Sequence, residues 1–144
     1  MADMNRLADI PVRVEGDAPD GAQAEGGMAE AIVGEVAQHL ARLVESGEAG
    51  AIDLQSMPMT EADKAALREA LGEGEVEATV QVIGPTRIHE TGYPGVWWIQ
   101  HMNAEEHVVA EQLEIARVPG LLSAHEADVR AALQRLRART QDEG

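Results

Sequence analysis

The spacing of apolar residues changes from four to two near Gly72, and this change limits the possible folds more than any other feature of the chain. Before this glycine, apolar side chains recur every fourth residue from Ile32 to Val44, the spacing of an amphipathic helix. After it, apolar and polar residues alternate from Val76 to Val82, the spacing of a strand with one face in water. A chain that uses both periods in separate segments is predicted to be an α+β domain.

Cap and turn residues divide the rest of the chain. Thr60 with Asp63, and Ser123 with Glu126, have the spacing of capping boxes that open helices. In the last helix, an apolar stripe of Val129, Leu133 and Leu136 is expected to be buried. We write the element order as α-β-α-β-β-β-α, with the three later strands in an antiparallel meander and the helices packed mainly on one face. The expected helices are 28–46, 60–71 and one after Ser123, and the expected strands are 51–54, 76–82, 87–91, 96–102 and 107–116.

The length of 144 residues fits one domain. We expect that domain to span residues 28–140. Residues 1–27 contain several glycines and acidic residues, a composition typical of a flexible arm. Residues 141–144 are expected to be a disordered tail.

Charge and composition restrict the partners. The net charge of −15 disfavours nucleic acid and anionic lipid, and favours either a basic or mixed protein surface or a purely solubilising role. The chain has no Cys, which excludes disulfides and thiolate-ligated metal sites. Met1–Ile10 contains no apolar run typical of a secretory signal, and no segment is apolar for the roughly 20 residues of a membrane span. We therefore expect a cytoplasmic protein without membrane insertion.

Catalytic motifs are missing from the sequence. His125-Glu126 begins like HExxH, but Val129 stands where the second zinc ligand belongs. The chain contains neither a complete dinucleotide fingerprint nor a P-loop, so we predict no enzymatic activity and no cofactor. One alternative remains: His101 and His107 would face each other if 103–106 is a tight turn, and a metal carrier could use them.

All three aromatic residues, Tyr93, Trp97 and Trp98, fall within six positions. Neighbouring strand residues point to opposite faces, so the two tryptophans belong to different surfaces. The turn positions assign Trp97 to a core with Ile88, Ile99, Val109, Leu113 and Ile115. They assign Trp98 to a polar face with Arg87, His89, Gln100, Gln112 and Glu114. On this register Trp98 is an exposed binding anchor, whereas a slip of one residue, or cover by a helix or the N-terminal arm, buries it.

Two segments resemble a known family. Ala51–Thr60 (AIDLQSMPMT) and Glu90–Trp98 (ETGYPGVWW) are similar to the "IDL.S.P.T" and "ET..PGVWW" segments of hydrogenase expression/formation proteins of the HupH/HyaF type. Leu71–Val76 and Val118-Pro119 also fit, and the resemblance covers roughly residues 29–139.

The resemblance implies a non-enzymatic chaperone in the maturation of uptake-type [NiFe] hydrogenases. Its partners would be an immature hydrogenase subunit, most of all the iron–sulfur-carrying small subunit, and other maturation proteins. The partner-binding residues we predict are Tyr93, Trp98, Arg87, His89, Gln100 and Gln112. Longer family members carry a second related domain, so a homodimer of this single-copy chain remains open.

Overall fold

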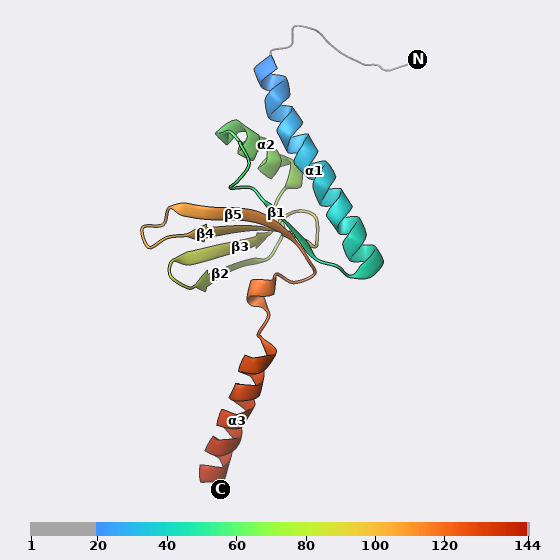
Figure 1. The fold of residues 1–144 in the computed structure, drawn as a ribbon. Helices are drawn as coiled ribbons and strands as arrows, with labels where there is room; N and C mark the ends of the chain where they lie inside the picture. Colours follow the sequence, from blue (N-terminus) through green and yellow to red (C-terminus); the bar gives the residue numbers. More distant parts are fainter. Residues whose placement is uncertain (1–19, 144) are drawn as a thin grey trace.

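A computed structural model describes residues 20–143 and consists of a five-stranded antiparallel sheet with three helices (Figure 1). The strand order in the sheet is β1-β5-β4-β3-β2. Along the chain the elements are α1 (Asp20–Ser46), β1 (Gly50–Asp53), α2 (Glu61–Leu71), β2 (Glu77–Gln81), β3 (Pro85–Glu90), β4 (Val96–Met102), β5 (Val108–Ile115), the short 3₁₀ helix η1 (Gly120–Leu122) and α3 (Glu126–Glu143).

This architecture confirms the α+β class and the antiparallel meander. The meander runs from β2 to β5, so it holds four strands where the order α-β-α-β-β-β-α counts three. The first strand then pairs with the last along the chain, with Ile52 opposite Leu113. The connection through α2 therefore returns the chain to the far side of the sheet.

The helix bounds differ from the expected ones at both ends of the chain. Helix α1 begins at Asp20, so residues 20–27 of the predicted arm are helical; the rest of that arm lies outside the described residues. Helix α3 runs to Glu143, through most of the segment expected to be a tail. Across residues 20–143, none of the helices combines the length and apolarity needed to cross a bilayer.

The main core lies between the sheet and the first two helices. One side of α1 and one side of α2 are buried against the helix-side face of β1, β4 and β5, as the four-residue apolar spacing predicts. The buried side chains of this core include Ile32, Val36, Leu54, Leu67, Trp98, Leu113 and Ile115.

A smaller cluster covers the opposite face of the sheet. Trp97 packs there with Ile88 and Ile99, and its Nε1 donates a hydrogen bond to the Ala116 carbonyl at 2.9 Å. The prediction that Trp97 is buried beside Ile88 and Ile99 is therefore confirmed.

A β-bulge reverses the predicted faces of β5. Met102 pairs with Val108 but His101 pairs with Ala110, so Val109 is an extra residue on β5. One extra residue moves every later side chain of the strand to the other face. Trp98 consequently lies opposite Leu113 in the main core and is only 2% exposed. The prediction that Trp98 is an exposed anchor beside Gln112 and Glu114 is wrong.

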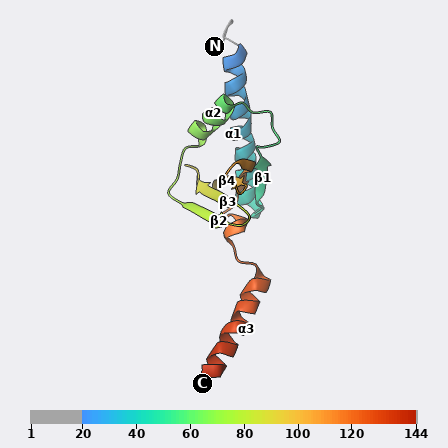
Figure 2. The same cartoon turned by 90° about the vertical axis from the view of Figure 1, so that its left-hand side faces the viewer.

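The predicted burial of the α3 stripe is also wrong. Figures 1 and 2 show α3 projecting away from the sheet, on the side remote from α2. Val129, Leu133 and Leu136 are 54%, 47% and 61% exposed. The helix begins at Glu126, and Ser123 instead ends η1, so the expected capping box there is not formed.

Burial of Trp98 leads to a stability prediction. Trp98→Ala removes a large core side chain and should lower the free energy of unfolding by about 3–5 kcal/mol. Chemical denaturation followed by circular dichroism measures this loss. Tyr93→Ala is the control. Tyr93 is 53% exposed, so its replacement should lower the free energy of unfolding much less. Equal stability of Trp98→Ala and the unchanged protein would contradict the packing described above.

Candidate functional site

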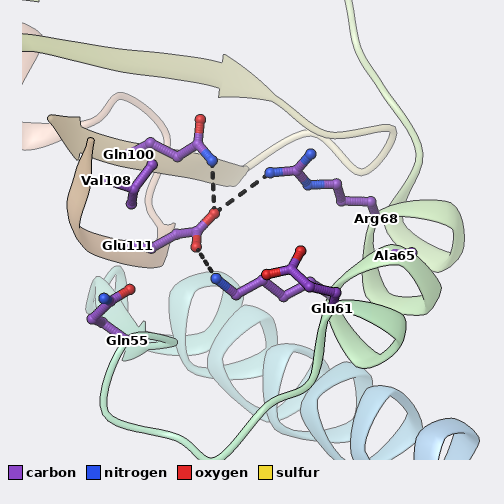
Figure 3. Close-up of a pocket in the computed structure, with 8 residues that line it drawn as sticks. Gln55, Glu61, Ala65, Arg68, Gln100, Val108 and Glu111 are labelled. Atoms are coloured by element: carbon purple, nitrogen blue, oxygen red, sulfur yellow. Dashed lines mark hydrogen bonds and ion pairs between the residues drawn. The ribbon is translucent and has the colours of Figure 1, made fainter. Parts of the chain in front are cut away.

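The candidate site is an open cavity of about 450 Å³ between α2 and the helix-side face of β4 and β5. We name it the Glu111 hollow, after the buried carboxylate in its wall (Figure 3). Its lining residues are Gln55, Glu61, Lys64, Ala65, Arg68, Gln100, Val108 and Glu111.

Four side chains surround the Glu111 carboxylate, which is itself only 1% exposed. Trp98 Nε1 donates to Oε2 at 2.7 Å and Gln100 Nε2 donates to the same oxygen at 2.9 Å. On the other side, Lys64 Nζ lies 2.9 Å from Oε1. The fourth group, Nη2 of Arg68, is 3.6 Å from Oε2 and belongs to a side chain that is 54% exposed. The carboxylate is thus paired and hydrogen-bonded, as a buried charge must be.

The start of α2 positions the two cations. Thr60 Oγ1 accepts the Asp63 backbone N–H at 3.0 Å and Asp63 Oδ2 accepts the Thr60 N–H at 3.0 Å, which confirms the capping box predicted for this helix. Lys64 and Arg68 are four residues apart, so they share the helix side that faces the sheet. The Arg68 guanidinium also lies over the Trp98 ring, 5.1 Å from its centroid.

Two opposing effects act on the Glu111 carboxyl. Burial, the largest single influence, raises its pKa. Hydrogen bonds from Lys64, Trp98 and Gln100, together with the charge of Lys64, outweigh burial and hold the pKa below its ordinary value of 4.5. Glu111 is therefore ionised at neutral pH and its oxygens are occupied by donors, which makes it a poor general base. Its interactions suit a structural role, because they fix the positions of the side chains around the hollow.

The backbone of Glu111 fixes another wall of the hollow. Its carbonyl accepts the N–H of Leu54 at 2.9 Å and that of Gln55 at 3.3 Å. Asp53 Oδ1 accepts the N–H of Gln55 at 2.9 Å and so supports the same turn. The connection from β1 to α2 is thereby attached to β5 at the residue whose side chain forms the site.

Some of the predicted partner-binding residues lie together at this site. Register places Glu111, Gln100, Arg87 and Thr79 in one row across β5, β4, β3 and β2, and opposed residues share a face. Gln100 lines the hollow and the exposed Arg87 continues its polar surface. His89 lies one row further along the same face, opposite the buried Trp98.

The other two predicted residues lie elsewhere. Tyr93 is in the turn between β3 and β4, at the end of the sheet. Gln112 is opposite Ile99, and so belongs to the face that α1 and α2 do not cover. The six residues do not form one continuous surface. The bulge at Val109 places Gln112 on the other face, Tyr93 lies in a turn, and Trp98 is buried.

The predicted histidine pair is not formed. His101 lies opposite Ala110, whereas the His107 carbonyl accepts the Asn103 N–H at 2.9 Å. The His101 ring instead has its Nδ1 3.0 Å from Thr86 Oγ1. Within the part of the chain that the structure describes, no three His, Asp or Glu side chains group in a way that could hold a metal.

Residues of the ETGYPGVWW segment build the turn that brings Trp98 to Glu111. Thr91 Oγ1 donates to the Val96 carbonyl at 2.9 Å and accepts the Tyr93 N–H at 3.2 Å. Gly95 has φ +95°, a conformation that other residues rarely adopt. Gly92 Cα faces α2 so closely that an added Cβ would lie 2.9 Å from the Leu71 carbonyl oxygen.

Glu111, Lys64 and Arg68 are not among the residues predicted from the sequence to bind a partner. Glu111 carried a usable signal, because it interrupts the apolar series that continues through Leu113 and Ile115. A charged residue in a buried position requires partners. Lys64 and Arg68, four residues apart on the neighbouring helix, were the candidates.

Comparison with known proteins gives consistent matches. The family model described as "HupH hydrogenase expression protein, C-terminal conserved region" matches residues 28–142. Hydrogenase expression/formation protein HupH of Rhizobium leguminosarum bv. viciae is 31% identical over 95% of this chain, and HoxQ of Azotobacter vinelandii is 29% identical over 91%. These matches cover 51% and 50% of the two relatives, so the chain spans about half their length.

A solved structure shares both fold and sequence. Hydrogenase expression protein HupH from Thiobacillus denitrificans superposes with a TM-score of 0.75 at 44% sequence identity. The match covers 81% of this chain and 97% of the solved one.

The pKa of Glu111 leads to a pH prediction. Because that pKa is lower in the folded than in the unfolded chain, its interactions stabilise the protein above the unfolded value and are lost as pH falls through the folded value. Glu111→Gln should lower the free energy of unfolding by about 1–3 kcal/mol at pH 7, since the amide places N–H donors against the donors of its neighbours. Below pH 4.5 the difference in the free energy of unfolding between Glu111→Gln and the unchanged protein should become smaller.

Urea titrations at several pH values measure this effect. Glu69→Gln is the matched control, because it removes an exposed carboxylate from α2, the helix that carries Lys64 and Arg68. The ion-pair description fails if Glu111→Gln and Glu69→Gln have the same stability at pH 7, or if the deficit of Glu111→Gln does not depend on pH.

Proposed function

This chain belongs to the HupH family of hydrogenase expression proteins, and on that premise we propose that it is a cytoplasmic, non-enzymatic chaperone in the maturation of a [NiFe] hydrogenase. The observation that carries the proposal is the match of residues 28–142 to the C-terminal conserved region of the family. That range contains every residue of the Glu111 hollow.

The client in this proposal is an immature hydrogenase subunit, and the iron–sulfur-carrying small subunit is the one that the sequence resemblance favours. A chain without Cys has no thiolate with which to bind an iron–sulfur cluster. It can hold a client while other proteins supply clusters and metals. The Glu111 carboxylate is already paired with its neighbours, which supports holding over catalysis.

The client surface we propose is the Glu111 hollow together with Arg87. Lys64, Arg68 and Arg87 are three of only 11 Lys and Arg residues in a chain with a net charge of −15. The Arg68 guanidinium is half-exposed and stacked on a fixed indole, so little side-chain entropy is lost when it binds. Arginines held in this way are common anchors of protein interfaces.

A pull-down tests the proposal. The tagged full chain, expressed in cells that mature a [NiFe] hydrogenase, should retain an immature hydrogenase subunit identified by mass spectrometry. Arg68→Ala combined with Arg87→Glu should weaken retention by about thirtyfold, as expected for loss of an interface anchor worth about 2 kcal/mol.

Arg42→Glu is the control, because it changes an exposed arginine on α1, away from the hollow. If no hydrogenase component is retained while maturation is active, the chaperone proposal is wrong. If Arg42→Glu loses the subunit as completely as the double variant, the function stands but the client surface lies elsewhere. If only the large subunit is retained, the client is the large subunit and not the small one.

A further inference from the structure

Helix α3 presents an apolar stripe that no other part of residues 20–143 covers. Val129, Leu133 and Leu136 follow the i, i+4, i+7 spacing of one helix side, and each is about half-exposed. Both views show the helix standing clear of the sheet (Figures 1 and 2). Most helices in proteins are stabilised chiefly by packing an apolar side on another surface, so α3 is expected to dock.

The charge of α3 indicates what that surface is like. The ten residues 130–139 carry four Arg and no Asp or Glu, in a chain whose net charge is −15. Arg130 makes a 2.6 Å ion pair with Glu126, one turn earlier on the helix. An apolar stripe flanked by arginines fits a surface that is apolar in its centre and acidic at its border.

The same chain offers such a surface at the end of the sheet where the β3–β4 turn lies. A cavity of about 340 Å³, which we name the end groove, lies between the last turns of α1 and the β3–β4 turn. Its lining residues are Leu40, Leu43, Val44, Glu90, Pro94, Gly95 and Arg117. Val44 is 80% exposed there, although it belongs to the apolar series of α1.

Acidic residues border the end groove. Glu90 lines both the groove and a neighbouring hollow whose other carboxylates are Glu73, Glu75 and Glu77. Arg117 is the one cation that lines either cavity among the described residues. Four carboxylates beside the exposed Val44 and the partly buried Leu40 match the arginines and the apolar stripe of α3 in charge and polarity.

We propose that α3 docks in the end groove of a second copy of this chain, which in turn docks its own α3 in the first copy. The exchange gives a closed two-fold dimer, the commonest form of soluble oligomer. It makes the same contact twice, which favours stability because durable interfaces bury about 1,600 Å² in total. The proposal uses residues outside the Glu111 hollow and does not depend on the proposed function.

The absence of Cys allows a direct test. One preparation carries Val44→Cys and another carries Leu133→Cys, and the two are mixed and mildly oxidised. The exchanged dimer should form a disulfide between the two preparations. Ala131→Cys is the matched control, because it lies on the side of α3 opposite the stripe and should form little of the same link.

Light scattering measures the assembly independently. The unchanged chain at tens of micromolar should have twice its 15.4 kDa mass. Leu133→Asp with Leu136→Asp should give monomers, and Ala131→Asp should remain dimeric. Circular dichroism checks that the sheet is kept in each variant.

Three outcomes overturn the proposal. The first is a monomeric unchanged chain, which leaves the α3 stripe for a different partner. The second is a disulfide within one chain when Val44→Cys and Leu133→Cys are combined in a protein of monomer mass, because the helix then docks on its own body. The third is a dimer that forms no Val44–Leu133 link beyond the Ala131 control, because the interface then lies elsewhere.

Discussion

The rest of the site depends on the interactions of the buried Glu111 carboxylate. Its side chain joins Lys64 and Arg68 of α2 to Trp98 and Gln100 of β4, and its carbonyl attaches the β1–α2 connection to β5. A buried ion pair contributes little net stability compared with a well-packed apolar replacement, but the loss of one partner leaves a costly uncompensated charge. Because an unpaired Glu111 carboxylate would be so costly, Lys64, Trp98 and Gln100 have to remain in contact with it. A polar cluster is therefore kept inside an otherwise apolar layer.

Local features of the fold were predictable, and the long-range register was not. Helix α2 and its Thr60–Asp63 cap depend on residues that are close in the sequence, and both follow from sequence spacing. The face of β5 depends on Val109, a single extra residue without the glycine or proline that often marks an irregular strand. Because a strand has a period of two, that residue moved Trp98 from the predicted surface into the core and brought Glu111 beside it.

The α3 stripe illustrates a different limit of sequence reasoning. The spacing of Val129, Leu133 and Leu136 correctly indicates which side of the helix is apolar. It contains no information about whether the covering surface belongs to the same chain. Helices α1 and α2 are brought to the sheet because short connections hold their apolar sides against it, whereas α3 follows η1 and points away from the sheet.

The two proposed surfaces are compatible with each other and with the length of the relatives. The Glu111 hollow and the end groove share no lining residue, so docking of α3 in the end groove uses none of the residues that line the Glu111 hollow. Relatives such as HupH of Rhizobium leguminosarum bv. viciae are about twice as long as this chain, since the match covers 51% of that protein. Two copies of the present chain together have the length of one such relative.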